Sequence, residues 1–562
     1  MKGVRLRRML AAVVALLMVV VVTGCAAIPT GGGVRVGGKI QEQAPPGVDY
    51  RPNGPTENAD QATILREFID AATGDQDNYA IAREFLSKRF AQRWNPRQSV
   101  MIRSGTGTIG RIDDSHYTYT MTASATVDAN GEYTPSVRPA FTTLSFQFVK
   151  EGGQWRISYA PDGIVLSPVS FASVFQAHPL YFYDPTHKYL VPDERWFLAR
   201  SSTSTRIVSA LLDGPSPWLK GAVVSAFPEG TQLSLNAVTT ANGTAQVDLT
   251  SDALKATATE KAWMREQLAQ SLSSVASISS VDITVEGTSL AIPPASGAAP
   301  LRDPDVDPRP VVAARQTVGF ATPGTAQLAT VPNIGAKIAA LDPTAIELTQ
   351  NDGSAAVLTA AGAYFVRAST SLPLRVDARP NLIAPSIDED GYLWSGESTD
   401  PTSIIAFDAN GGQHPIASSL PSGTLVAFAV SRDSSRALAL LNTSNGAALY
   451  VMGIVRNTAR QPTALTTPIR VQVASGTPLD AAWQSDLSIA SIGQTQAGVS
   501  VVSATIGGDS STLPKPAGTA TTVTGGSSDS ILLRMSDGSV LAQSGGGWDS
   551  TGITADVLAT QR

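Results

Sequence analysis

A degenerate repeat in residues 315–562 constrains the fold more than any other feature of the sequence. Short apolar runs recur there, separated by turns that are rich in Asp, Asn, Gly and Ser. A repeat of roughly 45 residues with about four strands is typical of one blade of a β-propeller. We therefore expect this region to be an all-β propeller of about five or six blades. The repeat is marked by five aspartates: Asp342, Asp388, Asp433, Asp486 and Asp529.

An all-β sandwich is the alternative for this region, because short strands at regular spacing occur in that fold too. Each marker aspartate stands just before a run that has the character of a strand. Aspartate side chains in turns commonly accept a hydrogen bond from the backbone two residues on. We therefore expect these aspartates to stabilise the turns of the blades.

The N-terminal segment has the pattern of a secretory signal. A cationic start with Lys2 and three arginines is followed by an uninterrupted apolar run over residues 9–22. That run is shorter than the about 20 residues that a membrane-spanning helix needs. We therefore expect residues 1–24 to be a signal peptide.

The only cysteine of the chain, Cys25, follows this segment directly. Together with Val22, Thr23 and Gly24 it resembles a bacterial lipobox, which has an aliphatic residue, two small residues and a cysteine. The resemblance implies that signal peptidase recognises Val22, Thr23 and Gly24, and that Cys25 receives an S-diacylglycerol and an N-acyl group such as palmitate. The alternative is a chance cysteine at the end of an uncleaved anchor helix. Two or more acyl chains bind a bilayer stably, so we expect a protein anchored on the extracytoplasmic face of the cell membrane.

Four segments lie between the signal peptide and the propeller. Residues 25–57 are rich in Gly and Pro without periodicity, which predicts a flexible tether. Residues 58–168 have helical patterns and then period-two alternation, which predicts an α+β domain with a distant similarity to small cone-shaped domains of the nuclear-transport-factor kind. Residues 169–292 mix helix and strand patterns, which predicts an α/β domain. Residues 293–314 form a linker rich in Pro, Ala and Asp.

Local patterns predict individual elements in the two smaller domains. The spacing of apolar residues predicts a helix over residues 79–90. Residues 105–110 read Gly-Thr-Gly-Thr-Ile-Gly, but no helix pattern follows, so we expect a glycine-rich turn rather than a dinucleotide site. Residues 223–227 and 231–238 are expected as strands, the second of them in a hairpin across the Asn242-Gly243 turn.

Composition argues against several classes of function. The net charge is −6, so there is no basic surplus for binding nucleic acid. One cysteine and four histidines leave few ligands for a thiolate or His-rich metal site. Neither a Gly-x-Ser-x-Gly elbow nor a P-loop occurs in the sequence. We therefore expect no catalytic residues, no cofactor, no metal and no nucleic-acid partner.

Three stretches of the middle segment resemble the GerMN domain, which occurs in sporulation and germination proteins. The resemblance implies a module that binds a ligand or a partner and has no catalytic residues. The stretches are residues 211–215 (Leu-Leu-Asp-Gly-Pro), 226–231 (Ala-Phe-Pro-Glu-Gly-Thr) and 243–249 (Gly-Thr-Ala-Gln-Val-Asp-Leu).

The whole layout is similar to that of the actinobacterial lipoprotein LpqB family. This resemblance implies an extracytoplasmic lipoprotein of the MtrA–MtrB two-component system, which binds the sensor domain of the MtrB histidine kinase and modulates signalling in cell-wall and division control. The alternative is an envelope hydrolase or a glycan-binding protein that uses the propeller channel. Besides the lipobox and the GerMN-like block, the resemblance rests on residues 181–185 (Tyr-Phe-Tyr-Asp-Pro), 190–196 (Leu-Val-Pro-Asp-Glu-Arg-Trp), 385–388 (Pro-Ser-Ile-Asp) and 391–394 (Gly-Tyr-Leu-Trp).

The lipobox leads to a direct prediction. Cys25→Ala removes the thiol that takes the diacylglyceryl group, so the variant should accumulate as an uncleaved, unlipidated precursor. Metabolic labelling with a fatty acid, followed by measurement of the chain's mass, tests this. Labelling of the variant at the level of the wild type would refute the lipobox assignment.

Overall fold

The computed structural model describes residues 52–562 except Ser201, residues 295–296, Asp305, Ala326, residues 527–529, Thr560 and Arg562. For residues 137–140 only the backbone is described. The predicted signal peptide, the lipobox with Cys25, and Asp529 lie outside the described residues. All of the described residues belong to one compact unit of the chain.

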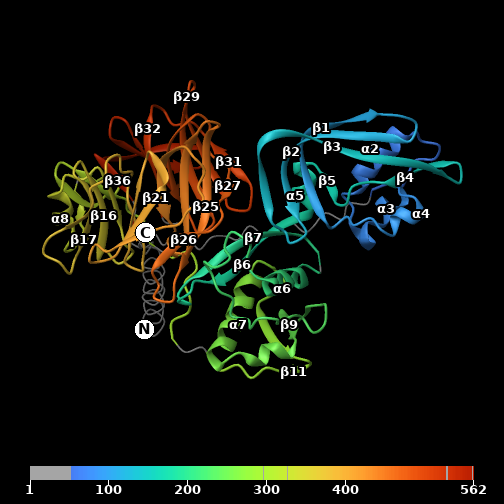
Figure 1. Ribbon diagram of the computed structural model, residues 1–562, viewed down its shortest axis with the longest axis horizontal. Helices are drawn as coiled ribbons and strands as arrows, with labels where there is room; N and C mark the ends of the chain where they lie inside the picture. Colours follow the sequence, from blue (N-terminus) through green and yellow to red (C-terminus); the bar gives the residue numbers. More distant parts are fainter. Residues whose placement is uncertain are drawn as a thin grey trace, which may run out of the picture. The chain divides into compact units, whose positions relative to one another are not determined.

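The first domain is a five-stranded sheet packed against short helices, as the α+β pattern predicted. Its strand order is β4-β3-β2-β1-β5, and only β5 runs parallel to its neighbour β1. Alternate residues of β2 are buried, from Tyr117 to Val127, because successive side chains of a strand point to opposite faces. Figure 1 shows α2, α3 and α4 gathered near β4. The elements are α2 (Gln61–Ala71), α3 (Gln76–Glu84), α4 (Lys88–Ala91), β1 (Ser99–Arg111), β2 (His116–Asp128), β3 (Tyr133–Glu151), β4 (Gln154–Tyr159) and β5 (Ile164–Leu166).

The expected single helix over residues 79–90 is wrong, because the chain leaves the helix between α3 and α4. Phe85 accepts a hydrogen bond of 2.9 Å from the backbone N–H of Ile157, and Ser87 donates one of 2.8 Å to the Ile157 carbonyl. Ile157 belongs to β4, so a short pairing with the sheet replaces the helical bonds here. The Ser87 hydroxyl then caps α4 by accepting a bond from Phe90.

Residues 105–110 form part of β1 and not the expected turn. The ladder between β1 and β2 shifts register between Ser104 and Thr108, which is the mark of a β-bulge. Gly107 lies in this bulge, where an added Cβ would stand 2.1 Å from the ring of Tyr119. The glycine therefore allows close approach of two strands, and the segment opens no helix that could hold a dinucleotide.

The middle domain combines a two-stranded hairpin, β6–β7, with a four-stranded sheet of order β11-β10-β9-β8. Helix α7 joins the parallel strands β9 and β10 and packs against β10 and β6. Its first turn is fixed by a reciprocal capping box between Thr257 and Glu260. The elements are α5 (Pro168–Val174), β6 (Phe175–Tyr183), β7 (Leu190–Leu198), α6 (Thr203–Asp213), β8 (Thr239–Ala241), β9 (Thr244–Leu249), the 3₁₀ helix η1 (Ser251–Lys255), α7 (Ala258–Leu272), β10 (Ser280–Val285) and β11 (Thr288–Ser289).

Two strands expected in this domain are absent from the described structure. Val224 makes only an isolated bridge to Tyr183, and two residues further on the Ala226 N–H donates to the side-chain oxygen of Gln267 at 2.9 Å. Residues 231–238 likewise contribute one bridge, from Leu233 to Leu249. The hairpin turn at Asn242-Gly243 is confirmed, but its first strand is β8, which follows the expected one.

The C-terminal region is a propeller of six blades, which confirms the expected fold class. Helix α8 (Gly335–Ala339) joins the first blade to the second. Blade 1 holds β12 (Val311–Ala314), β13 (Thr317–Phe320), β14 (Ala329–Thr330) and β36 (Val557–Ala559); blade 2 holds β15 (Ala345–Leu348), β16 (Ser354–Thr359), β17 (Gly362–Arg367) and β18 (Leu374–Asp377); blade 3 holds β19 (Ser386–Ile387), β20 (Leu393–Glu397), β21 (Asp400–Phe407) and β22 (Gln413–Pro415).

The remaining blades follow the same antiparallel plan. Blade 4 has an extra strand, β27, which pairs with β25 beside β26. Blade 4 holds β23 (Thr424–Val430), β24 (Arg436–Thr443), β25 (Gly446–Arg456), β26 (Pro462–Leu465) and β27 (Ile469–Val471); blade 5 holds β28 (Thr477–Trp483), β29 (Ser488–Thr495), β30 (Gly498–Thr505) and β31 (Ser510–Leu513); blade 6 holds β32 (Ala520–Gly525), β33 (Ile531–Met535), β34 (Ser539–Ser544) and β35 (Gly547–Thr554).

The marker aspartates share one position in three of the blades. Asp388, Asp433 and Asp486 each lie in the turn between the first and second strands of a blade. Asp342 is out of register, because it precedes the first strand of blade 2. In that blade the equivalent turn, between β15 and β16, contains Asp352.

The last strand, β36, closes the ring. It completes blade 1 by pairing with β12, so the two ends of the propeller sequence meet in one sheet. Its side chains enter two separate cores in alternation: Leu558 packs with residues of blade 6, and Val557 with residues of blade 2.

Closure predicts a large effect of one core substitution. Leu558 is 4% exposed, so Leu558→Ala should lower the free energy of unfolding by about 3 kcal/mol. Leu372→Ala, at a site that is 76% exposed, is the matched control and should change it by less than about 0.5 kcal/mol. Denaturant unfolding of both variants measures the difference, and equal effects would contradict the role given to β36.

Candidate functional site

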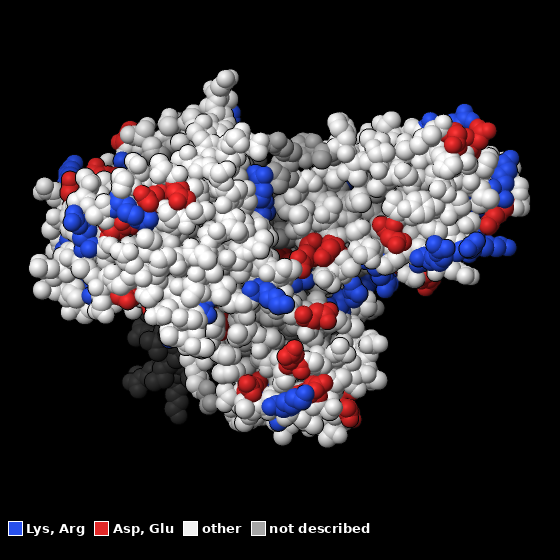
Figure 2. Space-filling model, viewed as in Figure 1, with Lys and Arg blue, Asp and Glu red and all other residues white. Residues whose placement is uncertain are grey.

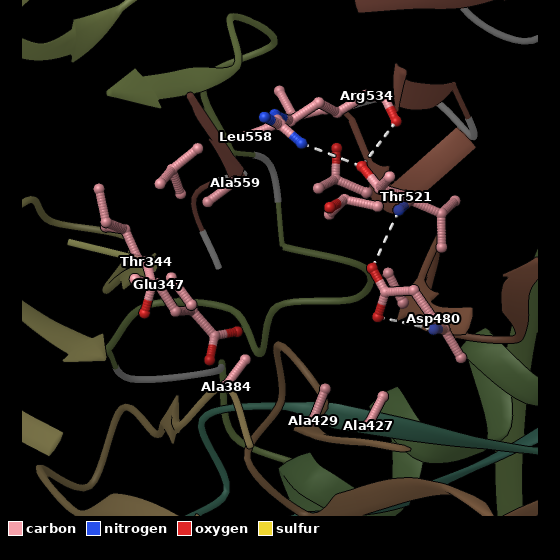
Figure 3. Close-up of a pocket in the computed structure, with 18 of the residues that line it drawn as sticks. Thr344, Glu347, Ala384, Ala427, Ala429, Asp480, Thr521, Arg534, Leu558 and Ala559 are labelled. Carbon is pink, nitrogen blue, oxygen red and sulfur yellow. Dashed lines mark hydrogen bonds between the residues drawn. The ribbon is translucent and has the colours of Figure 1, made fainter. Parts of the chain in front are cut away.

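The propeller encloses a central channel, which is the first candidate for a functional site. A cavity of about 330 Å³ lies on its axis. Its wall is built from the first strand of each blade or the segment that leads into it, with β36 serving blade 1. Figure 3 shows Glu347 and Asp480 on opposite sides of this cavity. The wall segments are residues 344–347, 384–385, 426–429, 480–482, 521–524 and 557–559.

Both of these carboxylates accept hydrogen bonds from the backbone of the next blade. Asp480, in blade 5, accepts one from Val523 of blade 6 at 3.0 Å and one from its neighbour Ala481 at 2.9 Å. Glu347, in blade 2, accepts one from Ile387 of blade 3 at 3.1 Å. The two side chains therefore tie adjacent blades together at the channel wall.

Burial raises the pKa of Asp480 to about 7, because the charged carboxylate loses its water and gains only backbone donors. Arg534 also lines the channel, but its Nη1 donates to Thr521 at 3.0 Å and its Nε to the Ala555 carbonyl at 2.8 Å. Across the described part of the chain, no group of three His, Cys, Asp or Glu residues is placed to hold a metal ion. The channel thus offers a small polar hollow whose charged groups serve the scaffold.

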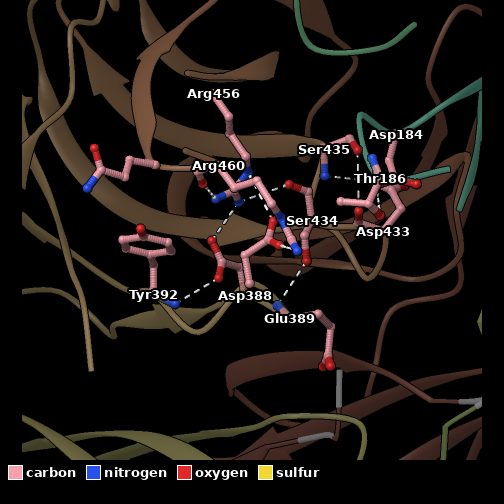
Figure 4. Close-up of polar contacts among 12 residues, drawn as sticks. Asp184, Thr186, Asp388, Glu389, Tyr392, Asp433, Ser434, Ser435, Arg456 and Arg460 are labelled. Atoms are coloured by element: carbon pink, nitrogen blue, oxygen red, sulfur yellow. Dashed lines mark hydrogen bonds and ion pairs between the residues drawn. The ribbon is translucent and has the colours of Figure 1, made fainter. Parts of the chain in front are cut away.

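A second polar cluster links blades 3 and 4 (Figure 4). Asp388 is fully buried and accepts bonds from the Tyr392 backbone at 2.8 Å and from the Trp394 indole at 2.9 Å. Arg456, in blade 4, pairs with the same carboxylate at 2.6 Å and donates to the Ser434 carbonyl at 3.2 Å. A buried ion pair whose oxygens all accept hydrogen bonds has a fixed geometry. Removing one partner leaves the other charge buried without compensation, which is strongly destabilising.

Blades 4 and 5 are joined in a similar way. Arg436, which is wholly buried, pairs with Asp433 and donates through Nη1 to the Asp486 carbonyl at 2.6 Å. Asp433 also accepts a bond of 2.8 Å from the Ser435 backbone, two residues on. The predicted turn role is therefore seen for Asp388 and Asp433, while the sequence reading missed Arg436 and Arg456. For Arg436 one signal was present, because a lone arginine precedes the apolar run of residues 437–441.

The four histidines occupy separate settings in the structure. His116 pairs with Asp113 at an exposed turn, and His178 bonds Ser274 inside the middle domain. Burial lowers the pKa of His178 to about 4. His187 stacks on Trp263 with ring centroids 3.7 Å apart, and His414 lies near Asp408. Two of these imidazoles contact a serine hydroxyl, Ser115 at His116 and Ser274 at His178. The predicted site residues Val22, Thr23, Gly24 and Cys25 lie outside the described residues.

The middle domain is joined to the propeller by specific contacts. The Trp196 indole of β7 donates to the Gly507 carbonyl at 2.8 Å, and Thr466 donates to the Trp218 carbonyl. One continuous apolar cluster contains buried residues of the middle domain and of blades 4 and 5. The first domain adds a bond of 2.8 Å from the Tyr133 hydroxyl to Asp509.

Charged side chains are sparse on the face that Figure 2 shows, and both signs are interspersed. This agrees with a composition in which charged residues make up only 16% of the chain. Electrostatic steering toward a highly charged partner therefore has little basis on this face.

Three family models match the chain in sequence order. The model described as "Lipoprotein LpqB, N-terminal domain" matches residues 54–172, and the one described as "Sporulation and spore germination" matches residues 179–291. The model described as "Lipoprotein LpqB beta-propeller domain" matches residues 319–556.

Curated relatives carry the same name. Lipoprotein LpqB of Cutibacterium acnes is 26% identical over 49% of this chain and 47% of its own length. Lipoprotein LpqB of Bifidobacterium longum is 30% identical over 44% and 45%, and that of Thermobifida fusca is 28% identical over 51% and 48%. The chain spans about half the length of the curated relatives that it matches.

Solved structures give only remote likenesses. A chain of a nidogen/laminin complex is 9% identical with a TM-score of 0.32, over 45% of this chain and 97% of that chain. A gluconolactonase, XC5397 from Xanthomonas campestris, is 12% identical with a TM-score of 0.30, over 46% and 89%. Likenesses of this size bear on neither the fold nor the function.

Fold and site together define a multidomain protein of two small modules and a six-bladed propeller, whose buried polar groups brace the scaffold. The matches supply the family within that class. The chain belongs to the LpqB lipoprotein family. Within the part of the chain that the structure describes, no helix is long and apolar enough to cross a membrane.

The structural role of Asp480 predicts a pH dependence. Its pKa is about 7 in the folded protein against an ordinary value of 3.8, so the folded state keeps a proton that the unfolded state releases. Folding stability from this group therefore falls as the pH rises from about 4 to about 7. The variant Asp480→Asn has no proton to release, so its melting temperature should rise relative to that of the wild type over this interval.

Thermal melts at pH 4, 5.5, 7 and 8 measure this difference. The control is Asp549→Asn, because Asp549 is exposed on β35. The control variant should show a nearly constant difference from the wild type. A pH-independent difference for Asp480→Asn would contradict the raised pKa.

Proposed function

We propose that this chain is a lipid-anchored, non-catalytic accessory of a two-component system. In this role it binds the extracytoplasmic sensor domain of an MtrB-type histidine kinase and modulates signalling in cell-wall and division control. The proposal takes the partner from the LpqB family resemblance and the mode of action from the geometry of the propeller.

The observation that carries the non-catalytic part is the engagement of the channel carboxylates. A hydrolase needs an acid and a base that are free to reach the substrate. Glu347 and Asp480 instead accept backbone N–H groups of neighbouring blades. A propeller whose blades are linked by such hydrogen bonds is a rigid scaffold, which is suited to presenting a surface to a protein partner.

The lipid anchor would place the protein close to its partner. Acyl groups on Cys25 would hold the chain at the outer face of the membrane, where the sensor domain of a membrane kinase lies. Confining both proteins to one surface raises their effective concentration without any new contact. A modest affinity between the two would then be sufficient for regulation.

An envelope hydrolase or glycan-binding protein is the second candidate. The cavity of about 330 Å³ is the observation that favours it, because a small polar ligand fits a hollow of that size. The occupied carboxylates weigh against hydrolysis more than against simple binding.

Affinity capture tests the main proposal. The sensor domain is immobilised, and the full chain is applied in a non-ionic detergent beside an unrelated lipoprotein of similar size. We expect retention of the chain and loss of the control. The Cys25→Ala variant should be retained equally in detergent, because the contact is made by protein and not by lipid. Retention no better than that of the unrelated lipoprotein would contradict the proposal.

A further inference from the structure

A separate cavity of about 200 Å³ lies where the first domain meets the middle domain. We call it the Arg97–Arg206 cavity. Its apolar side includes Phe175 and Trp196. Its polar side is lined by Tyr79 from α3, by Arg97 before β1, and by Arg200 and Arg206, which follow β7. None of these groups belongs to the propeller channel or to the contacts between blades.

Tyr79 is a buried polar residue of this cavity. It is 1% exposed and lines the cavity wall. The ring is held edge-on against Trp94, with centroids 6.3 Å apart. Burial, and then the charge of Asp75, raises the pKa of this phenol, so the hydroxyl stays protonated and able to donate. The Tyr79 phenol therefore adds a hydrogen-bond donor to the lining of the cavity.

The backbone places Tyr79 unusually. Asp77, Asn78 and Tyr79 have φ values of 48°, 58° and 62°, which is the left-handed region that L residues seldom enter. All three residues line the cavity. Such conformations persist where the surroundings fix them, and they are concentrated at binding sites.

The arginines supply positive charge that the cavity only partly balances. Arg200 pairs with Asp75, and Arg206 donates to the Ala129 carbonyl at 3.1 Å. The side chain of Arg97 makes no hydrogen bond or ion pair within the described residues. Burial, and then the like charge of Arg97, lowers the pKa of Arg206. Two guanidinium groups that repel each other beside a protonated phenol form a typical setting for an anion with several acceptor oxygens.

Three aspartates line the cavity, and two of them already form ion pairs or hydrogen bonds within the chain. Asp75 is engaged by Arg200, and Asp128 accepts the backbone N–H groups of Asn130 and Glu132, each at 2.9 Å. Asp77 stands at the exposed start of α3. Arg97 and Arg206 are thus left to face an incoming anion.

We propose that the Arg97–Arg206 cavity binds the phosphate group of a small ligand. Arg97 and Arg206 pair with the phosphate oxygens, the Tyr79 hydroxyl donates to one of them, and the body of the ligand lies against Phe175 and Trp196. A glycerol phosphate fits both the volume and the donor set, either as a soluble metabolite or as the headgroup of an anionic phospholipid.

Isothermal titration of the full chain in a non-ionic detergent tests this. The probes are glycerol 3-phosphate for the soluble source, dihexanoyl phosphatidylglycerol for the headgroup source, and glycerol as the uncharged control. We expect binding of at least one phosphate probe, no binding of glycerol, and an affinity that falls as salt is raised. Tighter binding of one phosphate probe identifies its source.

Two variants test the geometry. Tyr79→Phe keeps the ring and removes only the hydroxyl, so it should weaken binding by about tenfold, equivalent to about 1.4 kcal/mol. Arg97→Gln, on an exposed side chain, should weaken binding at least as much and reduce its salt dependence. Arg93→Gln is the matched control, because Arg93 is exposed in the same domain and does not line the cavity.

The melting temperature of each variant is recorded first, and Arg97→Gln provides a test if Tyr79→Phe fails to fold. The proposal is overturned if neither phosphate probe binds at millimolar concentration. It is also overturned if both cavity variants bind as the wild type and Arg93→Gln do. These results are independent of kinase binding, so the proposed function stands or falls separately.

Discussion

Closure of the propeller ring is the constraint on which most of the structure depends. Blade 1 is complete only when β36 returns to β12, and its side chains then fill the cores on both sides of that blade. Each blade contacts only its neighbours, so the rigidity of the ring depends on the contacts between adjacent blades. The hydrogen bonds and ion pairs between blades explain why buried Asp, Glu and Arg residues are found in a domain with so little charge overall.

These ties also shape the interpretation of function. Asp388 with Arg456, and Asp433 with Arg436, place full charges in the interior, where each is matched by an opposite charge and by hydrogen bonds. In an enzyme a buried carboxylate is held ready for substrate, whereas here it is saturated by the chain itself. Buried carboxylates can therefore serve either catalysis or the stability of the fold, and their hydrogen-bond and ion-pair partners show which of the two roles they have.

The sequence predicted the features that depend on local pattern. The alternation in β2, the turn at Asn242-Gly243 and the propeller with its aspartate-marked turns all follow from periodicity and turn chemistry. It could not predict features that depend on distant partners. The helix expected over residues 79–90 is interrupted by pairing with Ile157 of β4. Gly107, in the glycine-rich stretch of residues 105–110, is needed because the ring of Tyr119 lies where a side chain would stand. The pairing of Arg456 with Asp388 joins residues of different blades, so no spacing rule reveals it. The cavity at Tyr79 depends on the meeting of two domains and leaves no motif in either.

The place of β36 in the ring has a consequence for biosynthesis. The chain is synthesised from its N-terminus, so the two smaller domains are complete while blade 1 still lacks its innermost strand. Until β36 has been made, β12 presents an open edge, and open edges pair readily with other chains. The moment of greatest exposure to aggregation or proteolysis therefore comes late in synthesis, and it ends when residues 557–559 pair with β12.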